Sequence, residues 1–364
     1  MYRLPELQRQ RKLYVLMKRT TVFVIMLAAL GIVGCNKSEK EINEEYSSGV
    51  VLIKNIGYYE LKINDELSAY FTDYSEEKGL SNFTLDEDSI VAVTAFGTGF
   101  FVSEKGEIAT NNHVVGAMLS EKQALKAKNQ VVTALKSYCH SEYNDYKKAM
   151  DEITSALFVY ILNDTYDNDY YALKQAEEKC EQYMNAYANV YEYLGNVNLG
   201  DVDFSYNNII SVAYNDEYIT SSTDFVPCVL KAADKENDVA IIQLKTKKTP
   251  EGKHIFEVPD ENPIETSSLF YPGKNDKLFM IGFNLGPVLA LTEEGVKSQC
   301  TTGTISQDRT NSYLYSIPSL HGSSGAPVLN RKGELVAVNF AGIGSTQSFN
   351  YGVKVKYLRE LLKK

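Results

Sequence analysis

The feature that most constrains this sequence is a serine, Ser324, that lies in a glycine-flanked turn ahead of an apolar strand. The segment is Gly322-Ser323-Ser324-Gly325-Ala326-Pro327. A serine hydroxyl is a weak nucleophile unless a base removes its proton and backbone N–H groups hold the resulting oxyanion. Flanking glycines allow the turn and leave room for a carbonyl group. By itself such a segment is more often an ordinary loop than a nucleophilic turn.

Two further segments contain the partners that a nucleophilic serine needs. The four histidines are His113, His140, His254 and His321. His113 follows the apolar segment Gly97–Val102, and Asp238 directly precedes the apolar run Val239–Ile242. An aspartate in that position can orient an imidazole and stabilise its protonated form. Singly, His113 would fit a core histidine and Asp238 a turn residue, but three such segments in one chain favour a catalytic group.

The order of the three residues along the chain selects among the folds that use such a group. The order His113, Asp238, Ser324 is that of the chymotrypsin class. In α/β-hydrolases the histidine follows the serine, and no histidine follows Ser324 here. The stretches Gly97–Val115, Asn237–Leu244 and Ser319–Phe340 resemble the trypsin-like serine proteases of the HtrA/Deg type. In that family a Gly-x-Gly-Phe strand, an Asn-His-Val-Val segment, an Asp-Leu-Ala strand and a Gly-Asn-Ser-Gly-Gly turn recur.

The resemblance, over roughly residues 49–116 and 203–364, implies a mainly β fold: a chymotrypsin-like double β-barrel with the active site between the barrels. It implies that His113 is the general base, that Asp238 orients it and that Ser324 is the nucleophile. The oxyanion hole would consist of the backbone N–H groups of Gly322 and Ser324, with Ser323 in the turn between them.

The serine turn departs from the family pattern at two positions, and the residues near it predict which substrates would be cleaved. Ser323 replaces the usual Asn or Asp, and Ala326 replaces the second glycine. By resemblance, the predicted substrate-binding residues are Pro318, Ser319, His321, Phe340, Ala341 and Gly342. Because Pro318 and Ser319 at the predicted floor of the S1 pocket are not acidic, we expect small or medium apolar P1 residues rather than Lys or Arg. Phe340–Gly342 would pair with an extended substrate backbone.

The N-terminal segment is predicted to direct export. Lys18 and Arg19 precede the apolar run Val22–Val33, and Gly34-Cys35 follows, which is typical of a signal peptide over residues 1–34. The ending resembles a bacterial lipobox, which implies lipidation of Cys35; a transmembrane anchor is the alternative, although the run is short for one. Residues 35–48 are acidic and are predicted to be a solvated tether. We therefore expect a lipid-anchored protein of the cell envelope of a Gram-negative bacterium.

Composition excludes several other classes of protein. The net charge is −10, and it becomes −15 without residues 1–34, which hold six basic and one acidic side chains. Nucleic acid is therefore a poor partner. The sequence has no glycine-rich phosphate loop and no clustered Cys/His spacing, so we expect neither cofactor nor metal. The remaining cysteines form no recognisable disulfide framework, and they are left unpaired: Cys139, Cys180, Cys228 and Cys300.

A long insertion separates the predicted base from its aspartate. Residues 117–202 have apolar side chains at helical spacing and no Gly or Pro between Gly116 and Gly195, which predicts an antiparallel helical hairpin with a turn near Asn163–Asn168. The acidic residues of that turn fit helix capping better than a calcium loop. The first barrel then covers residues 49–116 and 203–250, and the second, with a C-terminal helix, residues 251–364.

These observations predict a membrane-tethered serine endopeptidase that processes proteins in the envelope or takes part in their quality control. Its substrates would be proteins or peptides. We expect the hairpin to gate the cleft or recruit substrates, since only 40 residues follow Ser324 and no PDZ domain is recognisable. The alternative is a non-catalytic binding protein that uses the hairpin as its partner surface. Oligomeric state is left open.

Overall fold

The computed structural model describes residues 36–65, 67–117, 119–200, 202–264, 277–342 and 350–363. The predicted signal peptide and the predicted lipidation site, Cys35, lie outside the described residues. The chain forms two compact units. Unit 1 comprises residues 1–53, 96–114 and 211–364, and unit 2 comprises residues 54–95 and 115–210. We describe each unit by itself.

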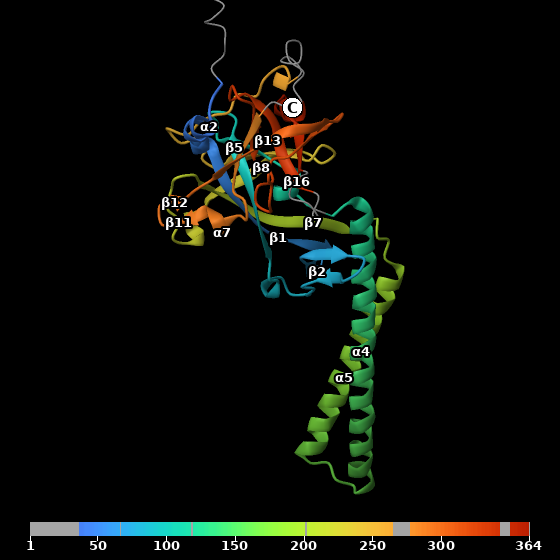
Figure 1. The fold of residues 1–364 in the computed structure, drawn as a ribbon. Helices are drawn as coiled ribbons and strands as arrows, with labels where there is room; N and C mark the ends of the chain where they lie inside the picture. The colour runs from blue at the N-terminus through green and yellow to red at the C-terminus, as the bar shows by residue number, and fades with distance from the viewer. Residues whose placement is uncertain are drawn as a thin grey trace, which may run out of the picture. The chain divides into compact units, whose positions relative to one another are not determined.

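Seven strands form the first sheet, in the order β2-β1-β5-β6-β9-β8-β7 (Figure 1). A further pairing of β1 with β7 closes six of these strands into a ring. The strands are β1 (Val50–Lys62), β2 (Ser68–Phe71), β5 (Val93–Phe101), β6 (Glu107–Thr110), β7 (Asp203–Tyr214), β8 (Val226–Asp234) and β9 (Val239–Leu244). β1 and β7 each contain residues of both units. Ring closure leaves few strand edges exposed, which protects a sheet from pairing with other chains.

Six antiparallel strands form a closed barrel in the second half of the chain, in the order β10-β13-β14-β17-β16-β15. They are β10 (Lys277–Gly282), β13 (Gln299–Asp308), β14 (Ser312–Tyr315), β15 (Pro327–Leu329), β16 (Leu335–Gly342) and β17 (Asn350–Lys354). Inward and outward residues alternate along β14, where Tyr313 and Tyr315 are fully buried. The predicted mainly β, chymotrypsin-like double barrel with a helical insertion is thus confirmed.

The remaining elements are short, apart from those of the insertion. The helices are α2 (Glu39–Tyr46), α3 (Asn112–Val115), α7 (Pro287–Ala290) and α8 (Val355–Leu362), with 3-10 turns η1 (Ser47–Gly49), η2 (Glu87–Ser89) and η3 (Ser222–Asp224). Two small hairpins pair β3 (Asp73–Ser75) with β4 (Gly79–Ser81) and β11 (Leu291–Thr292) with β12 (Gly295–Val296). Within the described ranges, no helix is long and apolar enough to cross a membrane.

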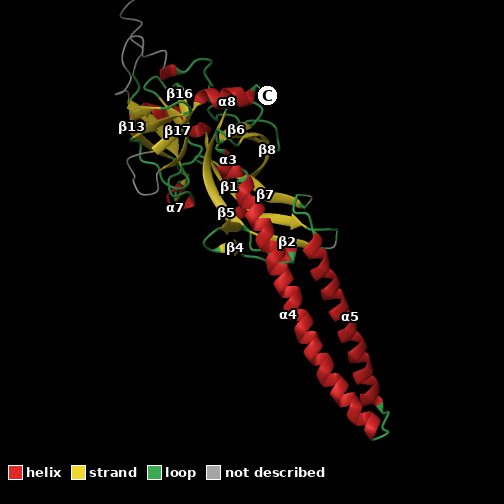
Figure 2. Cartoon of the chain, turned by 90° about the vertical axis from the view of Figure 1, so that its right-hand side faces the viewer, coloured by secondary structure: helices red, strands yellow, loops and turns green. Residues whose placement is uncertain are grey.

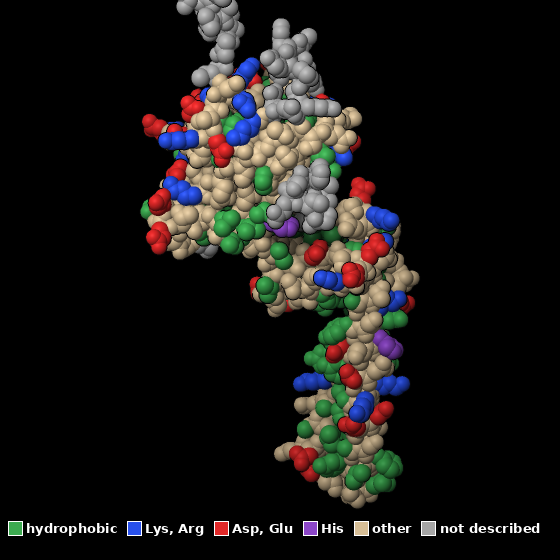
Figure 3. Space-filling model, in the orientation of Figure 1, with side chains coloured by type: hydrophobic (Ala, Val, Ile, Leu, Met, Phe, Trp, Pro, Cys, Tyr) green, Lys and Arg blue, Asp and Glu red, His purple; other side chains and the backbone are tan. Residues whose placement is uncertain are grey.

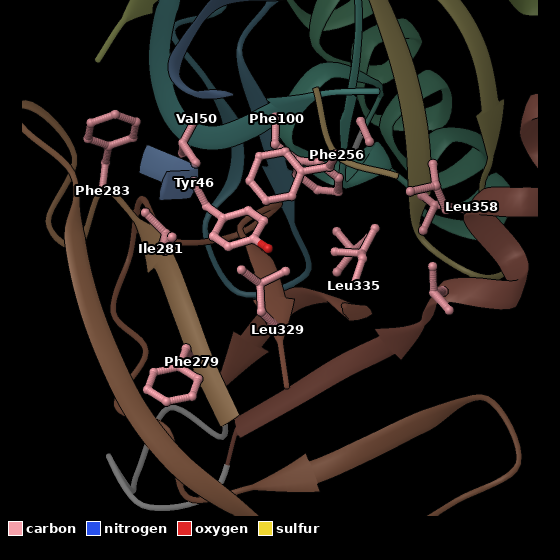
Figure 4. Close-up of a cluster of buried hydrophobic side chains, with 14 of the residues drawn as sticks. Tyr46, Val50, Phe100, Phe256, Phe279, Ile281, Phe283, Leu329, Leu335 and Leu358 are labelled. Atoms are coloured by element: carbon pink, nitrogen blue, oxygen red, sulfur yellow. The ribbon is translucent and has the colours of Figure 1, made fainter. Parts of the chain in front are cut away.

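The main hydrophobic core of unit 1 is built from both barrels (Figure 4). Phe100 from β5 and Phe256 pack edge to face, with ring centroids 5.0 Å apart. Phe279 and Ile281 from β10 belong to the same cluster, and all four side chains are at most 2% exposed. Burying a side chain of this size contributes about 1.5–3 kcal/mol. This shared core thus joins strands of both barrels within unit 1.

The predicted tether is wrong for most of its length. Residues Glu39–Tyr46 form helix α2, which begins at a capping box between Ser38 and Glu41. Ile42 is 0% exposed, and Tyr46 packs edge to face on His254 at 4.6 Å. The acidic side chains suggested a solvated segment, but the two apolar residues four positions apart lie on one helical face and join the core of unit 1.

Unit 2 contains the predicted helical hairpin, which is also confirmed. Helices α4 (Glu121–Leu162) and α5 (Asn168–Asn196) run side by side (Figures 1 and 2). Ser120 caps α4 and Asp167 caps α5. The N-terminal half of α4 packs on the strands of unit 2, where Val131 and Leu135 join a cluster with Phe71. This packing explains why residues 54–95 belong with the hairpin, whereas the predicted domain borders assigned them to the first barrel.

Candidate active site

The carboxylate of Asp238 holds His113 at two points, one on its imidazole and one on its backbone. His113 Nδ1 lies 2.7 Å from Asp238 Oδ2, and the backbone N–H of His113 donates to Oδ1 at 2.9 Å. The two side chains are 31% and 23% exposed, so one edge of the imidazole is open to solvent. An imidazole held in this way at Nδ1 has Nε2 left to accept a proton.

Asp238 reaches this position through an unusual backbone conformation. It has φ +53°, in the left-handed region that residues with a Cβ seldom occupy. The Nδ2 group of Asn111, a fully buried residue, donates to the carbonyl oxygen of Asp238 at 2.8 Å. Asn111 thereby fixes the backbone on which the carboxylate stands. Strained residues of this kind persist where the surrounding structure holds them, and they gather at functional sites.

The turn before Ser324 has the geometry of a type II β-turn. The backbone N–H of Ser323 donates to Leu320 O at 3.0 Å, and Gly322, at the third position of the turn, has φ +95°. A side chain at Gly322 would also collide with Phe283 O and Gly286 N, each 2.4 Å from an ideal Cβ. In the described part of the chain, no acceptor is bound by the N–H of Gly322 or of Ser324. Both amides therefore remain able to bind a ligand oxygen.

Thr98 ties this turn to the strands that present the histidine. Its backbone N–H donates to Ser324 O at 2.8 Å, and its hydroxyl donates to Gly322 O at 2.7 Å and accepts from the N–H of Phe283 at 3.0 Å. The hydroxyl of Thr110, three residues before His113, donates to Thr98 O at 2.7 Å. Thr98 is fully buried, so each of these bonds is shielded from water.

Gly325 allows the serine turn to approach the strand that leads to His113. An ideal Cβ at Gly325, which has φ +89°, would lie 2.1 Å from Thr98 O and 2.3 Å from Thr110 Oγ1. Only glycine fits there. Within the residues described, no hydrogen bond joins the Ser324 hydroxyl to the imidazole of His113.

Ser323, which departs from the family pattern, lies in a buried polar network. Its hydroxyl donates to Leu320 O at 2.7 Å and lies 2.9 Å from Ser319 Oγ. Asn339 Nδ2 donates to Ser323 O at 2.9 Å and to Ser319 Oγ at 3.0 Å. The second departure, Ala326, is fully buried and is not among the residues with positive φ. Both substitutions are therefore accommodated without backbone strain.

The predicted substrate-binding residues lie around this turn. Pro318 and His321 are exposed, whereas Ser319 is half-buried in the network with Asn339. Phe340 is half-buried against Tyr351, with ring centroids 5.7 Å apart. Ala341 and Gly342 end β16. The turn pairs with β16 at Asn339, whose backbone N–H donates to Ala326 O and whose carbonyl oxygen accepts from the N–H of Gly325. The roles of these residues stay predictions.

Sequence reasoning missed Thr98, Thr110 and Asn111. Their contribution depends on partners far away in the chain, because Thr98 and Gly322 are 224 positions apart and Asn111 and Asp238 are 127 apart. One local signal was available. Thr98 is a hydroxyl residue between two glycines in the apolar half of its strand, and a buried hydroxyl requires a partner.

Comparison with known proteins shows what part of this chain is similar to. Residues 197–338 match the family model for the trypsin-like peptidase domain. A probable periplasmic serine endoprotease, DegP-like, from Bartonella henselae is 34% identical over 79 residues, which are 22% of this chain and 15% of that protein. The structure of the serine endoprotease from Yersinia pestis is similar at a TM-score of 0.43 and 12% identity, with 90% of this chain and 66% of that chain covered. The chain thus spans less than two thirds of either protein.

The matched segment, residues 197–338, is therefore similar to a trypsin-like peptidase domain. It contains Asp238 and Ser324, whereas His113 lies before it, on the other side of the hairpin in sequence.

Proposed function

We propose that this protein is a serine endopeptidase of the HtrA/Deg type, with Ser324 as nucleophile, His113 as general base and Asp238 as the residue that orients the base. The observation that carries the proposal is the two-point contact of His113 with Asp238 beside a serine turn that Thr98 and Thr110 hold against the histidine strand. The family match over residues 197–338 supports it.

The reaction follows from what each group can do. Ser324 Oγ attacks the carbonyl carbon of a peptide bond while His113 Nε2 takes the hydroxyl proton. The protonated imidazole, stabilised by the Asp238 carboxylate, then gives that proton to the nitrogen of the leaving amine, and the C–N bond breaks. Water, deprotonated by His113, attacks the acyl-enzyme ester and releases the acid product. The chain's own residues supply every group for these steps.

The oxyanion of each tetrahedral intermediate would be bound by the N–H groups of Gly322 and Ser324. The turn supports this assignment, because within the described residues the N–H groups of Gly322 and Ser324 bind no acceptor of the chain. A donor of this kind contributes about 3 kcal/mol to the stability of the transition state.

Selectivity is proposed from the residues that precede the turn. Pro318 and Ser319 bring no acidic group to the predicted S1 pocket, and Ser319 is engaged with Ser323 and Asn339. A Lys or Arg side chain at P1 would therefore lack a carboxylate partner. We expect cleavage after Ala, Val or Leu. A set of quenched fluorescent peptides that differ only at P1 measures this; strict cleavage after Arg would contradict it.

The site of action is proposed to be the cell envelope, with the protein anchored by lipid at Cys35. The signal-like segment ahead of Gly34-Cys35 supports this, and so does the similarity to a probable periplasmic protease. Expression with a radiolabelled fatty acid tests the anchor: the wild type should take up label, and Cys35→Ala should not. Equal labelling of both would contradict it.

Hydrolysis of a denatured protein and of the preferred peptide tests the activity itself. We expect the wild type to cleave both and Ser324→Ala to cleave neither. Ser141→Ala, at an exposed serine of α4, serves as the control that leaves the serine turn unchanged. A wild-type protein that cleaves no peptide under any condition would favour the alternative, a binding protein on a peptidase scaffold.

A further inference from the structure

The tip of the helical hairpin exposes a group of apolar side chains. These residues, which we call the tip surface, are between 50% and 68% exposed (Figure 3): Phe158, Val159, Ile161, Leu162, Tyr166 and Tyr171. They belong to the last turns of α4, the connecting turn and the first turn of α5. An exposed apolar cluster of this kind commonly marks an interaction site.

Hydrogen bonds and ring packing in the connecting turn hold the tip surface in a defined shape. Thr165 donates its N–H to Tyr160 O at 3.0 Å, and the Asp167 carboxylate accepts from the N–H groups of Asp169 and Tyr170. The Tyr170 ring packs edge to face on Tyr166, with ring centroids 5.0 Å apart. The exposed side chains therefore stand on an ordered turn, which lowers the entropy that a partner must overcome on binding.

The charges around the tip surface are mainly negative, because Lys174, one turn after Tyr171 on α5, is paired with Glu177. Lys148 and Lys174 are the nearest basic residues on either side, and no Lys or Arg occurs between them. The same stretch has five exposed carboxylates: Asp151, Glu152, Asp164, Asp167 and Asp169. None of the five forms an ion pair within the described ranges. The apolar cluster therefore lies in a field of unneutralised negative charge.

That charge decides among the possible partners. An anionic membrane would be repelled, since basic residues are what anchor a protein to such a surface. A second copy of this chain would meet its own negative charge, because the net charge is −10. The complementary partner has apolar side chains for the tip surface and Lys or Arg for its carboxylates.

We propose that the tip surface binds extended segments of other proteins in which apolar side chains alternate with Lys or Arg. Such segments are normally buried in folded proteins and become accessible on unfolding. The proposal deepens the proposed function, on which it rests, by naming the class of substrate that the hairpin would recruit. Binding at the tip itself requires no catalysis.

Binding is measured with the full chain carrying Ser324→Ala, so that the probe stays intact. The probe is a short fluorescein-labelled peptide in which Leu and Phe alternate with Lys; the two control peptides replace Lys by Glu, or Leu and Phe by Ser. Fluorescence anisotropy should give an affinity for the first peptide at least about ten-fold higher than for either control. Added salt should weaken this binding. Equal affinities for the three peptides would overturn the proposal.

Variants locate the binding. Phe158→Ser, Leu162→Ser and Tyr171→Ser together should weaken binding by at least about ten-fold. Asp164→Asn with Asp169→Asn should weaken it about three-fold and reduce its salt dependence, and Asp167 is kept because it caps α5. The matched control changes three other exposed apolar residues, Val91→Ser, Leu125→Ser and Tyr218→Ser, which are 73%, 52% and 69% exposed. Loss of binding in the control but not in the tip variant would contradict the proposal.

Two further measurements separate the outcomes. Circular dichroism should show the same helix content in the tip variant and the wild type. Sedimentation of the wild type and the tip variant tests self-association; an oligomer that only the tip variant loses would overturn the proposal in favour of a second copy. Failure of the proposed function would instead appear in the protein with Ser324 intact, as a lack of peptide hydrolysis, while the binding assay stays readable.

Discussion

The barrel core of unit 1 and the hairpin of unit 2 use aromatic residues in opposite ways. In the core, Phe100 and Phe279 are at most 1% exposed. Along the hairpin, Tyr146 stacks on Tyr183 at 4.9 Å, yet Tyr183 is 49% exposed. Beyond Cys139, Leu157 is the one residue of α4 that is described as buried. The core is thus enclosed and can hold side chains of the candidate site in fixed positions. The outer hairpin consists of two helices with a narrow contact between them, and apolar side chains remain exposed on its surface.

The largest expected effect is a loss of catalysis without a loss of peptide binding at the tip surface. Asp238→Asn removes the charge that orients His113 and stabilises its protonated form, so we expect kcat to fall by about 10⁴-fold. Binding of the basic apolar peptide at the tip surface should not change. Glu236→Gln, an exposed carboxylate two residues earlier, is the control and should leave kcat unaltered. Activity of Asp238→Asn within a few-fold of wild type would contradict the assignment.

The next effect concerns which residues belong to the enclosed core. Ile42 of α2 is fully buried, so Ile42→Ala should lower the free energy of unfolding by about 2–5 kcal/mol. Leu157→Ala, in the outer hairpin, should instead speed amide exchange in α4 and α5 and leave the unfolding of the barrels unchanged. Chemical denaturation and hydrogen exchange measure the two. If Ile42→Ala had the same free energy of unfolding as the wild type, residues 39–46 would be better described as a solvated tether.

A smaller effect tests how Thr98 holds the serine turn. Thr98→Val keeps the shape of the side chain but leaves Gly322 O and the N–H of Phe283 without their buried partner. We expect a loss of about 1–3 kcal/mol in stability for each group and a fall in kcat of about 10–100-fold, with KM little changed. Thr98→Ser retains the hydroxyl and should recover most of the activity. Equal kcat in Thr98→Val and wild type would exclude a positioning role.

The smallest effect is a pH dependence of the core. Burial lowers the pKa of His254, which packs between Tyr46 and Phe256. The unfolded chain therefore binds a proton at His254 more readily than the folded chain, so stability is retained above the unfolded pKa of about 6.5 and declines as the pH falls below it. The melting temperature should fall between pH 7 and pH 5, and less so in His254→Phe. An identical decline in both proteins would assign the effect to other groups.

Local pattern predicted much of this molecule. The apolar strand before His113, the strand that starts at Asp238 and the two helices joined near Asn163–Asn168 all follow from periodicity and turn residues. The apolar periodicity predicted where the helices lie more accurately than it predicted which of their side chains are buried. Ile161 and Tyr183 belong to the predicted apolar stripes but are 51% and 49% exposed, because an isolated pair of helices covers only a narrow seam.

What the sequence could not predict depends on contacts between distant segments. The bond from Thr98 to Gly322 O joins strand β5 to the serine turn, which no local pattern connects. Helix α2 was missed because its four glutamates outweighed Ile42 and Tyr46 in the composition of a short segment. Only the packing of that face on the core reveals it as structure.

The central claim, that Ser324 is a nucleophile activated by His113 and Asp238, is tested most directly with a fluorophosphonate probe. Purified protein is treated with the probe, and the modified residue is found by mass spectrometry of its peptides. We predict phosphonylation at Ser324 in the wild type, strong slowing in His113→Ala and Asp238→Asn, and none in Ser324→Ala. A wild-type protein that never reacts, or one in which Ser324→Ala is labelled as fast, would contradict the account.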